Sequence, residues 1–397
     1  MSRIEQCATG RDKSFLLPDW NGNSLQLTEA YSGARILVIG AAGSIGRAVT
    51  KLLIRFKPHQ LHLIDISENG LADLIRELRM TSSTSSKTDF KTFCIDVTSG
   101  QFKCFARTYS YDYTFNLSAL KHVRLEKDDF SLTRALNVNI ASHYSILDNL
   151  NSLSPKGYFA VSTDKAAYPA NYMGLSKRLM EFYLLESEKS YSTNIPIVCA
   201  RFANVAFSAG SLLNSWHERL KRKEPIVVPI NTFRFFISHE EAAQICVLSL
   251  IVEKGRYVTI PRDTSVNRKK EMLKVAEKYL EEHGFSSILF TNEKEALRKK
   301  PDSVYPILLT PRDTAGEKEE EIFSEKGESI ETVPNIRKLK IIRKELASSI
   351  FQEPFHNLIR YIDETTIIKR SQLDYFAKLI CPTFDHISAE KNLDEKI

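Results

Sequence analysis

A glycine-rich turn between a short apolar run and a helical pattern most constrains the fold of this chain. The segment VIGAAGSIGR places Gly40, Gly43 and Gly46 after the apolar run ARILVIG and at the start of the helical pattern SIGRAVTKLLIRF. Glycines at such a turn let the backbone approach a pyrophosphate, which the positive N-terminus of the helix attracts. The spacing is GxxGxxG instead of the commoner GxGxxG, and the physical logic is the same. The sequence therefore predicts a dinucleotide-binding strand–turn–helix unit.

Strands and helices alternate along the first half of the chain. Further apolar, β-rich runs lie at residues 60–66, 90–97, 111–119, 157–163 and 195–205. This alternation predicts an α/β fold of the Rossmann type, with a doubly wound parallel sheet and crossover helices on both faces. After about residue 205 the alternation weakens, which suggests a smaller C-terminal substrate lobe and then a helical tail.

We therefore predict four parts along the chain. They are a polar N-terminal lead-in with little periodicity (1–32), an NAD(P)-binding Rossmann domain (33–205), a nucleotide-sugar substrate lobe that returns elements to the sheet (206–333) and a helical C-terminal extension (334–397).

The composition is that of a folded protein in a reducing compartment. Of the 397 residues 43% are hydrophobic and 26% are charged, which is ample for a buried core. The net charge of +6 is dispersed and no nucleic-acid-reading module is visible, so we expect no nucleic-acid partner. The six Cys are scattered without metal-ligand spacing, so no metal site is predicted. No apolar stretch reaches the ~20 residues of a membrane helix and no signal-peptide core is present, so we expect a cytoplasmic protein without membrane insertion.

An acidic residue at the end of the second apolar run bears on the choice of cofactor. Asp65, in LIDISE, could bind the adenosine ribose hydroxyls and repel a 2′-phosphate, which favours NAD over NADP. Arg47, directly after the glycine turn, favours NADP mildly, and Asp65 could instead cap the next helix. Asp96 and Val97 end the third run and would flank the adenine. The residues predicted to bind the cofactor are Gly40, Gly43, Ser44, Ile45, Gly46, Asp65, Asp96, Val97 and Lys177.

The segment YMGLSKRLME has the appearance of a short-chain dehydrogenase catalytic helix with one substitution. Such an enzyme needs a Tyr four residues before a Lys, because the ammonium then helps the phenol to lose its proton. Here Met173 stands four residues before Lys177, and Met has no proton to exchange. Tyr172 is displaced by roughly 100° around the helix, and Tyr168 precedes Pro169, outside it. Neither phenol can replace the missing one without a change of register.

Replacement chemistry is available directly after the fifth apolar run. Thr163, Asp164 and Lys165 lie at the carboxyl end of the predicted strand, where open α/β sheets place ligands. In such a place the Asp can serve as acid and the Lys as base. The alternative is an ordinary surface pair that begins a loop. The predicted catalytic residues are Thr163, Asp164, Lys165, Met173 and Lys177.

Several segments together resemble a known family. GAAGSIG, DISE, SALKHVRLE, STDKAAYPANYMGLSKR, RFANVAFSAGS and AGEK resemble, in order, segments of the bacterial nucleotide-sugar 4,6-dehydratases of the polysaccharide-biosynthesis (CapD/FlaA-like) group. These extended short-chain dehydrogenase/reductases act on UDP-N-acetylglucosamine, and the resemblance spans about residues 33–325. Some members have Tyr at the position of Met173, and others have Met. The membrane-anchored members carry N-terminal spans that are not seen here, so the resemblance implies a soluble form.

The resemblance implies a redox-neutral reaction with bound NAD, although NADP is possible. Hydride would leave C4 of the sugar and return to C6, giving a UDP-4-keto-6-deoxy-HexNAc with or without inversion at C5. Lys165 would abstract the C5 proton, Asp164 would protonate the departing C6 hydroxyl, and Thr163 would hydrogen-bond the sugar near O4. Lys177 would bind the nicotinamide ribose.

The resemblance also implies a set of substrate-binding residues. They are Lys121, His122, Asn204, Arg234, Glu317 and Lys318. Arg234 would meet the diphosphate, since a guanidinium can bind phosphate oxygens in pairs. A family His is replaced here by Asn116, and the usual Asn of the long helix at 129–150 is either Asn137 or Asn139.

Two other functions remain open at this stage. A C4-epimerase on the same UDP-sugar would share fold and cofactor, but epimerases usually keep the Tyr that Met173 replaces. A catalytically silent regulator that binds NAD and a nucleotide sugar is favoured by Met173 and Asn116, and opposed by the retained Thr-Asp-Lys cluster. A sugar reductase that consumes NADH is a further possibility. We expect a homo-oligomer with a UDP-sugar substrate, because family members often associate through helices beside the sheet.

Overall fold

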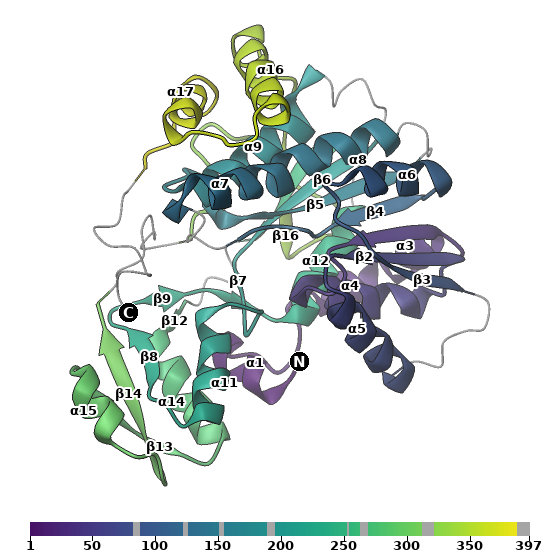
Figure 1. Cartoon of the computed structure of the whole chain (residues 1–397). Coiled ribbons are helices and arrows are strands. Elements are labelled where there is room, and N and C mark those ends of the chain that lie inside the picture. The colour runs from purple at the N-terminus through teal and green to yellow at the C-terminus, as the bar shows by residue number, and fades with distance from the viewer. Residues whose placement is uncertain are drawn as a thin grey trace.

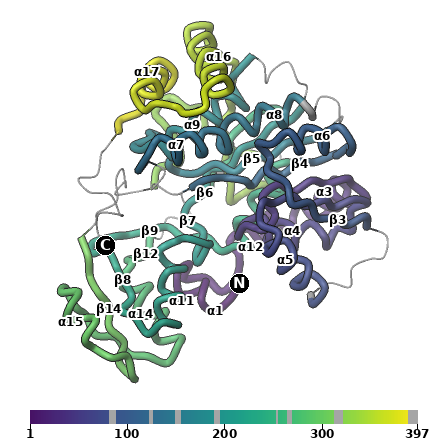
Figure 2. Tube along the Cα trace, viewed as in Figure 1, coloured from purple at the N-terminus to yellow at the C-terminus, as the bar shows by residue number. Residues whose placement is uncertain are grey.

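The chain folds into a large lobe built around a sheet and a smaller lobe built from the middle of the chain (Figure 1). The tube in Figure 2 shows that the large lobe contains both early and late parts of the sequence. This computed structural model describes residues 1–81, 88–121, 126–150, 155–188, 195–251, 254–262, 269–311 and 321–386.

In the described residues, nine strands form the sheet of the large lobe, in the order β15-β16-β11-β6-β5-β4-β1-β2-β3. Neighbours from β3 to β11 run parallel, and β16 and β15 are antiparallel. The order reverses between β1 and β4, which opens a crevice for ligands at the carboxyl ends of these strands. The strands are β1 Arg35–Ile39, β2 Gln60–Asp65, β3 Asp89–Cys94, β4 Tyr113–Asn116, β5 Gly157–Thr163, β6 Ile197–Phe202, β11 Arg256–Pro261, β15 Ile330–Thr332 and β16 Leu339–Arg343.

Helices cover both faces of this sheet (Figure 1). The α4 and α12 helices pack together on one face, and α6 to α9 lie on the other. Between α7 and α8 the helix continues through a π-helical turn, η3 (Asn137–Ala141). The helices are α4 Ser44–Leu53, α5 Glu68–Thr81, α6 Gly100–Thr108, α7 Asp129–Leu136, α8 Ser142–Leu150, α9 Tyr172–Glu186 and α12 His239–Ser249.

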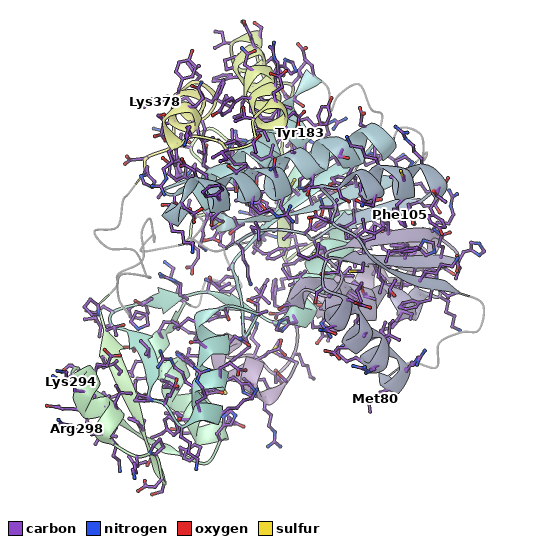
Figure 3. The ribbon with its side chains drawn as sticks, in the orientation of Figure 1. Met80, Phe105, Tyr183, Lys294, Arg298 and Lys378 are labelled. Atoms are coloured by element: carbon purple, nitrogen blue, oxygen red, sulfur yellow. The ribbon has the colours of Figure 1, made fainter. Side chains whose placement is uncertain are left out.

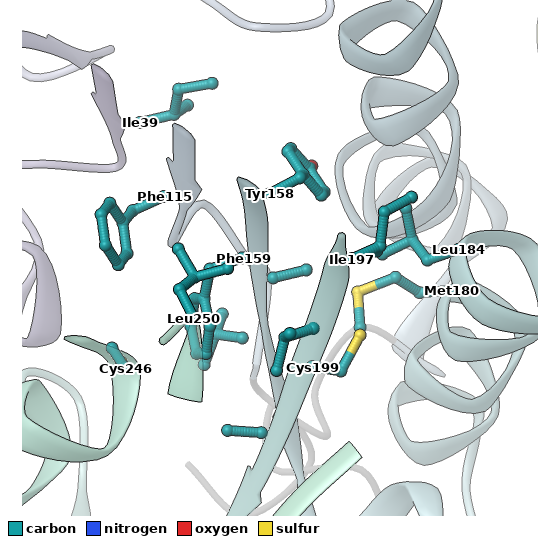
Figure 4. Packing of buried hydrophobic residues seen from close by; sticks show 14 of the residues in the cluster. Ile39, Phe115, Tyr158, Phe159, Met180, Leu184, Ile197, Cys199, Cys246 and Leu250 are labelled. Carbon is teal, nitrogen blue, oxygen red and sulfur yellow. The ribbon is translucent and has the colours of Figure 1, made fainter. Parts of the chain in front are cut away.

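The core lies between the central strands and these helices. The strands β5 and β6 read as nearly continuous apolar runs because both faces of a parallel sheet are buried. Figure 4 shows side chains from both sides meeting there: Ile39, Phe115, Tyr158, Phe159, Ile197 and Cys199 from strands, Met180 and Leu184 from α9, and Cys246 and Leu250 from α12 and its end. The predicted doubly wound α/β fold with a smaller lobe is confirmed.

The smaller lobe has its own sheet and core. Its strands β8 (Ile226–Pro229), β14 (Val304–Thr310) and β13 (Ser286–Phe290) pair in parallel. Trp216 and Tyr279 are fully buried at its centre. Its helices are α11 Leu212–Arg222, α14 Met272–Glu282 and α15 Glu293–Arg298. Figure 3 labels Lys294 and Arg298 on α15, at the outer edge of this lobe.

Two short strand pairs lie where the lobes meet. The strand β7 (Asn204–Val205) runs parallel to β10 (Phe236–Ile237). The strand β9 (Phe233–Arg234) is antiparallel to β12 (Lys270–Glu271). β7 follows β6 almost directly and carries the chain from the sheet toward the smaller lobe, and Figure 1 shows β9 and β12 beside β8 in that lobe.

The N-terminal residues differ from the polar lead-in that the sequence predicts. They form three helices, α1 (Arg3–Thr9), α2 (Leu17–Gly22) and α3 (Ser24–Tyr31). Leu27 and Tyr31 are fully buried, and the Tyr31 hydroxyl donates a hydrogen bond to the Val247 carbonyl at 2.8 Å. Helices of six to eight residues bury only a few side chains each, so their periodicity is hard to see in the sequence.

The predicted helical C-terminal extension begins with a strand, β16, and becomes helical only after it. β16 extends the sheet by pairing with β11, and it covers an edge that would otherwise be open. The helices α16 (Ser349–Glu364) and α17 (Arg370–Ile380) then pack together beside α9 (Figure 1). The four-part division of the chain stays a prediction. The sheet of the large lobe also includes β15 and β16, which come late in the sequence. Among the helices described, none combines the length and apolar character needed to cross a bilayer.

Candidate functional site

The glycine turn has the geometry that a bound phosphate group needs. Gly40 has a φ of +75°, and a Cβ at Gly46 would lie 2.1 Å from the Gly40 carbonyl oxygen. Gly43 is the N-cap of α4, and no side chain caps this helix. The first-turn N–H groups are therefore open to an anion. Beside them, the Ser44 hydroxyl accepts a hydrogen bond from the Ala209 backbone and joins the turn to the segment after β7, and Ile45 is half-buried.

Asp65 lies at the end of β2, against this turn. Its carboxylate accepts hydrogen bonds from the backbone N–H groups of Ala42 and Ser67, both at 2.9 Å. The alternative that Asp65 only caps the next helix is not supported, because the Ser67 hydroxyl accepts the Gly70 N–H at the start of α5. Asp65 thus couples the glycine turn to the end of the second strand.

Arg47 is held by the protein itself. Its guanidinium donates to the Ala42 carbonyl at 2.9 Å, to the Gly70 carbonyl at 2.8 Å and to the Glu77 carboxylate at 2.7 Å. These three bonds fix the side chain across the turn and α5. The mild sequence argument for NADP that Arg47 offers is therefore weakened.

The end of β3 is anchored to the long helix. Asp96 accepts hydrogen bonds from Thr98 and from the Arg134 guanidinium, the latter at 2.7 Å. Burial alone would raise the pKa of Asp96, but these bonds and the Arg134 charge outweigh it and lower the pKa. Val97 is buried. Both residues lie where the sequence predicts them, and their contact with adenine stays a prediction.

Thr163, Asp164 and Lys165 lie together at the carboxyl end of β5. The Lys165 ammonium is 3.1 Å from Asp164 Oδ1, and the Thr163 hydroxyl donates to the same oxygen at 2.8 Å. Thr163 also caps the short helix η4 (Asp164–Ala166). The Asp164 side chain is 5% exposed, whereas that of Lys165 is 33% exposed. A buried carboxylate thus holds an ammonium that can still reach a ligand.

The start of α9 packs directly on this cluster. A Cβ at Gly174 would lie 2.5 Å from the Lys165 carbonyl oxygen, so the helix can approach only through this glycine. Met173 and Lys177 are buried. The Lys177 ammonium donates to the Val161 carbonyl at 2.9 Å, and burial lowers its pKa to about 8.

The hydroxyls of the two nearby phenols are bonded to residues outside this cluster. The Tyr172 hydroxyl donates to Asp374 on α17 at 2.8 Å. The Tyr168 hydroxyl accepts the backbone N–H of Lys326. Neither is available as the missing catalytic Tyr.

Of the two candidate Asn residues of the long helix, Asn139 is buried and makes contacts that join the helix to its neighbours. Asn139, in the π-helical turn, accepts from the Leu120 N–H and donates to the Leu120 carbonyl, both at 3.0 Å. It also donates to the Ser176 hydroxyl at 2.9 Å, which ties this helix to α9. Asn116 is buried at the end of β4 and donates to the Tyr158 hydroxyl at 3.1 Å. Asn139 and Asn116 are both buried, and their hydrogen bonds join neighbouring helices and strands of the site to one another.

Two of the predicted substrate residues meet at a residue that the sequence reasoning missed. Asn204 donates to Glu321 at 3.0 Å, and the Arg234 guanidinium is 4.0 Å from the same carboxylate oxygen. Lys121 donates to the Ser208 hydroxyl at 3.3 Å. Glu321 belongs to a run of acidic residues, and nothing in that run distinguishes it. The predicted residues His122, Glu317 and Lys318 lie outside the described residues.

The comparison with protein families is decisive for classification. Residues 36–325 match the family described as "Polysaccharide biosynthesis protein". The chain belongs to this family. The family membership predicted from the sequence is therefore confirmed, over most of the chain and including the glycine turn, the β5 cluster and α9.

Curated relatives of this family member are distant. An uncharacterized membrane protein, MJ1061 of Methanocaldococcus jannaschii, is 29% identical over 65% of this chain and 75% of its own length. The probable polysaccharide biosynthesis protein EpsC of Bacillus subtilis is 27% identical. The capsular polysaccharide biosynthesis protein CapD of Staphylococcus aureus is 25% identical. The match to each of these two covers 59% of this chain and only 39% of the relative.

Solved structures share the fold. Pen from Bacillus thuringiensis has a TM-score of 0.64 at 20% identity, covering 85% of this chain and 99% of its own. UDP-glucose 4-epimerase from Thermotoga maritima has a TM-score of 0.53 at 16% identity, covering 73% of this chain and 88% of its own. At these identities the likeness concerns the architecture alone.

Proposed function

We propose that this family member is a nucleotide-sugar 4,6-dehydratase. It converts UDP-N-acetylglucosamine, or a close UDP-HexNAc, into the 4-keto-6-deoxy sugar with loss of water, for surface polysaccharide or glycan biosynthesis. The observation that carries the proposal is the buried Asp164, which holds a partly exposed Lys165 at the carboxyl end of β5. An acid and a base on adjacent residues suit an elimination, which needs one proton removed and one supplied.

The residues at the carboxyl ends of β1 and β2 fit a dinucleotide. The uncapped N-terminus of α4 and the close approach at Gly46 would hold the pyrophosphate. Asp65 would hold the adenosine ribose, and its negative charge favours NAD over NADP. NAD bound there would supply the oxidation and reduction that a redox-neutral dehydration needs.

The proposed roles of the residues are those that the family resemblance implies. Lys165 would take the proton from C5, Asp164 would protonate the leaving C6 hydroxyl, and Thr163 would hydrogen-bond the sugar near O4. Lys177 would bind the nicotinamide ribose. Its lowered pKa of about 8 supports a site in which an ammonium is costly and easily gives up its proton.

Substrate binding would use the residues where the lobes meet. Arg234 would bind the diphosphate, and Lys121 and Asn204 would contact the sugar. The proposal extends to His122, Glu317 and Lys318 by family resemblance alone.

A C4-epimerase is the second candidate, because several relatives carry that name, including the UDP-glucose 4-epimerase of Rickettsia typhi at 28% identity. Met173 opposes it, since an epimerase of this fold usually uses a phenol at this position. The Tyr172 hydroxyl, bonded to Asp374, does not supply one.

The direct test uses the pure protein, UDP-N-acetylglucosamine and no added cofactor, with the product analysed by mass spectrometry. A 4-keto-6-deoxy product that has lost water is expected. UDP-N-acetylgalactosamine at unchanged mass would indicate the epimerase. Absence of turnover on any UDP-HexNAc, with NAD still bound, would indicate the silent regulator.

The base assignment has its own test. Lys165→Ala should abolish the elimination and leave NAD binding unchanged, measured by mass spectrometry and by calorimetry. The matched control is Lys156→Ala. Lys156 directly precedes β5 in the sequence, and its side chain is 63% exposed. Normal turnover in Lys165→Ala would contradict the assignment.

A further inference from the structure

The loop 167–171 connects the cluster at the end of β5 to α9. The short helix η4 ends at Ala166, and α9 begins at Tyr172. Within the loop Tyr168 has a φ of +47°, a left-handed conformation that is strained for a residue with a bulky side chain. A strained conformation of this kind persists only where the surrounding structure holds it. The shape of the loop therefore depends on contacts with other parts of the chain.

Late parts of the chain supply these contacts. The Tyr168 N–H donates to Glu325 Oε1 at 2.8 Å, and the Thr383 hydroxyl donates to the same oxygen at 3.4 Å. The Asp385 N–H donates to the Pro169 carbonyl at 3.1 Å. Thr383 and Asp385 both follow α17, so the residues after this helix lie against the loop at two points.

Tyr172, the first residue of α9, is held by both its backbone and its side chain. Its N–H donates to Glu126 Oε1 at 2.7 Å, and its hydroxyl donates to Asp374 Oδ1 of α17 at 2.8 Å. Its ring packs on those of Phe384 and His386, with centroids 5.7 and 4.7 Å apart. His386 Nε2 lies 3.0 Å from Glu126 Oε2, so this carboxylate also joins the start of α9 to the residues after α17.

The start of α9 in turn contacts the backbone of the proposed acid and base. A Cβ at Gly174 would lie 2.5 Å from the Lys165 carbonyl oxygen, so helix and cluster touch there without spare room. On the loop side, the Ala167 N–H donates to the Asp164 carbonyl at 3.3 Å. A displacement of Tyr172 would therefore move Gly174 against or away from Lys165, and close packing passes such a movement on.

The contacts on Tyr172 and the loop come largely from residues that lie beyond the family match. That match ends at residue 325, and α17 and the residues after it follow later in the chain. The sequence assigned no site residue to this extension. Its contacts with the loop and with the first residue of α9 nevertheless place it next to the Thr163–Lys165 cluster in space.

We propose that α17 and the tail segment 381–386 form a positioning element for the Asp164–Lys165 pair, with the Tyr172–Asp374 hydrogen bond as its anchor. The inference rests on the proposed function for its catalytic meaning. Tyr172 is buried and bonded to α17, so it acts through α9 and the loop and exchanges no proton with the substrate.

The first test measures amide hydrogen exchange by mass spectrometry and needs no substrate. Asp374→Ala removes the acceptor of the Tyr172 hydroxyl, whereas Asp374→Asn keeps an oxygen in its place. We expect the amides of residues 166–173 to exchange about fivefold faster in Asp374→Ala and at the wild-type rate in Asp374→Asn. Tyr172→Phe, which loses the same bond and keeps the ring contacts, should resemble Asp374→Ala.

Three results of this test would overturn the proposal. The first is unchanged exchange at residues 166–173 in both Asp374→Ala and Tyr172→Phe. The second is an acceleration of equal size in Asp374→Asn, because the hydrogen-bond acceptor would then not be what holds the loop. The third is faster exchange throughout the protein, which would show a general loss of stability.

The second test measures turnover in the same variants. We expect kcat for dehydration to fall about fivefold or more in Asp374→Ala and Tyr172→Phe, because a small misplacement of reacting groups slows catalysis strongly. KM and NAD affinity should stay unchanged, since neither residue is part of the proposed cofactor or diphosphate sites. Asp374→Asn should keep the wild-type kcat. An unchanged kcat in the first two variants, or a loss confined to KM, would contradict the positioning role.

The matched control is Lys378→Ala, on the same helix, where the side chain is exposed (Figure 3). It should change neither exchange nor turnover. The two tests also separate the two proposals. If exchange responds as expected and the wild type dehydrates no UDP-HexNAc, the anchoring of the loop stands and the dehydratase function fails. If the wild type is a dehydratase and exchange does not respond, the function stands and the anchoring fails.

Discussion

Asp65 and Arg47 lie near the glycine turn and carry opposite charges, so in the proposed cofactor site they would act in opposite directions on a 2′-phosphate. The Asp65 carboxylate is oriented by two backbone N–H groups at 2.9 Å. Arg47 is already engaged by two carbonyls and by Glu77. Arg47 is therefore not free to bind a 2′-phosphate while these bonds are made.

We accordingly expect Asp65→Asn to shift the preference from NAD toward NADP. The amide removes the repulsion of a 2′-phosphate and weakens the ribose hydrogen bonds. The ratio of the two dissociation constants should change by about tenfold or more, which corresponds to ~1.4 kcal/mol. Calorimetric titration with both dinucleotides measures it. An unchanged ratio would show that Asp65 only supports the turn.

Several elements are joined by a buried chain of charged groups next to β5. Arg201 of β6 bonds Glu181 of α9 at 2.6 Å and Glu328, before β15, at 2.7 Å, and all three side chains are buried. Lys344, after β16, bonds Glu328 at 2.6 Å. Glu181 also accepts from the Ser162 hydroxyl at 2.6 Å. Because Ser162 precedes Thr163, this network holds the end of β5 that carries the Thr163–Lys165 cluster.

Removing Arg201, the arginine that both carboxylates share, should lower the stability of the protein. Arg201→Leu leaves two buried carboxylates without their guanidinium, and we expect the free energy of unfolding to fall by about 3–5 kcal/mol. Urea unfolding at neutral pH measures the change. The control is Arg222→Leu, whose guanidinium is 55% exposed and pairs with Glu224, and which should have no measurable effect.

The loss of stability at acid pH provides an independent measurement of the same network. Burial alone would raise the pKa of Glu328, but Arg201 and Lys344 outweigh it and lower the pKa from 4.5 to about 2. The stability from this ionised group is thus fully present above pH ~4.5 and is lost as the pH falls toward ~2, a loss of about 3 kcal/mol. In Arg201→Leu this part of the acid dependence should shrink. An identical acid dependence in both proteins would contradict the assignment.

The whole molecule encloses α9 on all sides. The inner face of α9 packs on the sheet, and Phe355 of α16 packs on Phe182 and Tyr183 of its outer face, with ring centroids 4.8 and 5.9 Å apart. Figure 3 labels Tyr183 on the side of the large lobe where α16 and α17 lie. The expected homo-oligomer stays a prediction. Phe355 of α16 covers this part of the outer face of α9, which is therefore not open to a second subunit.

Phe355→Ala should therefore destabilise the molecule strongly. The side chain is fully buried, and its loss leaves a cavity between α16 and α9. We expect the free energy of unfolding to fall by about 3–5 kcal/mol in urea titrations. The control is Ile350→Ala on the same helix, where the residue is 75% exposed and the change should stay within about 0.5 kcal/mol. Equal effects in the two variants would mean that α16 does not stabilise α9.

Local patterns in the sequence were sufficient for the sheet, the glycine turn and the Thr163–Lys165 cluster. Strand and helix periods and the spacing of three glycines act over a few residues, so they can be read without knowing the fold. The same patterns showed that Met173 takes the place of a phenol. They did not reveal the short N-terminal helices, whose burial depends on partners far away in the chain.

Only the tertiary structure tied Asn139 to Leu120 and Ser176, turned Tyr172 toward α17 and brought Glu321 to Asn204. Glu321 and Asn204 are 117 residues apart in the sequence, and Tyr172 and Asp374 are 202 apart. No local period or spacing links such residues. Their meeting is decided by the order of the strands and the return of the chain to the sheet, because that packing determines which distant side chains share a buried space.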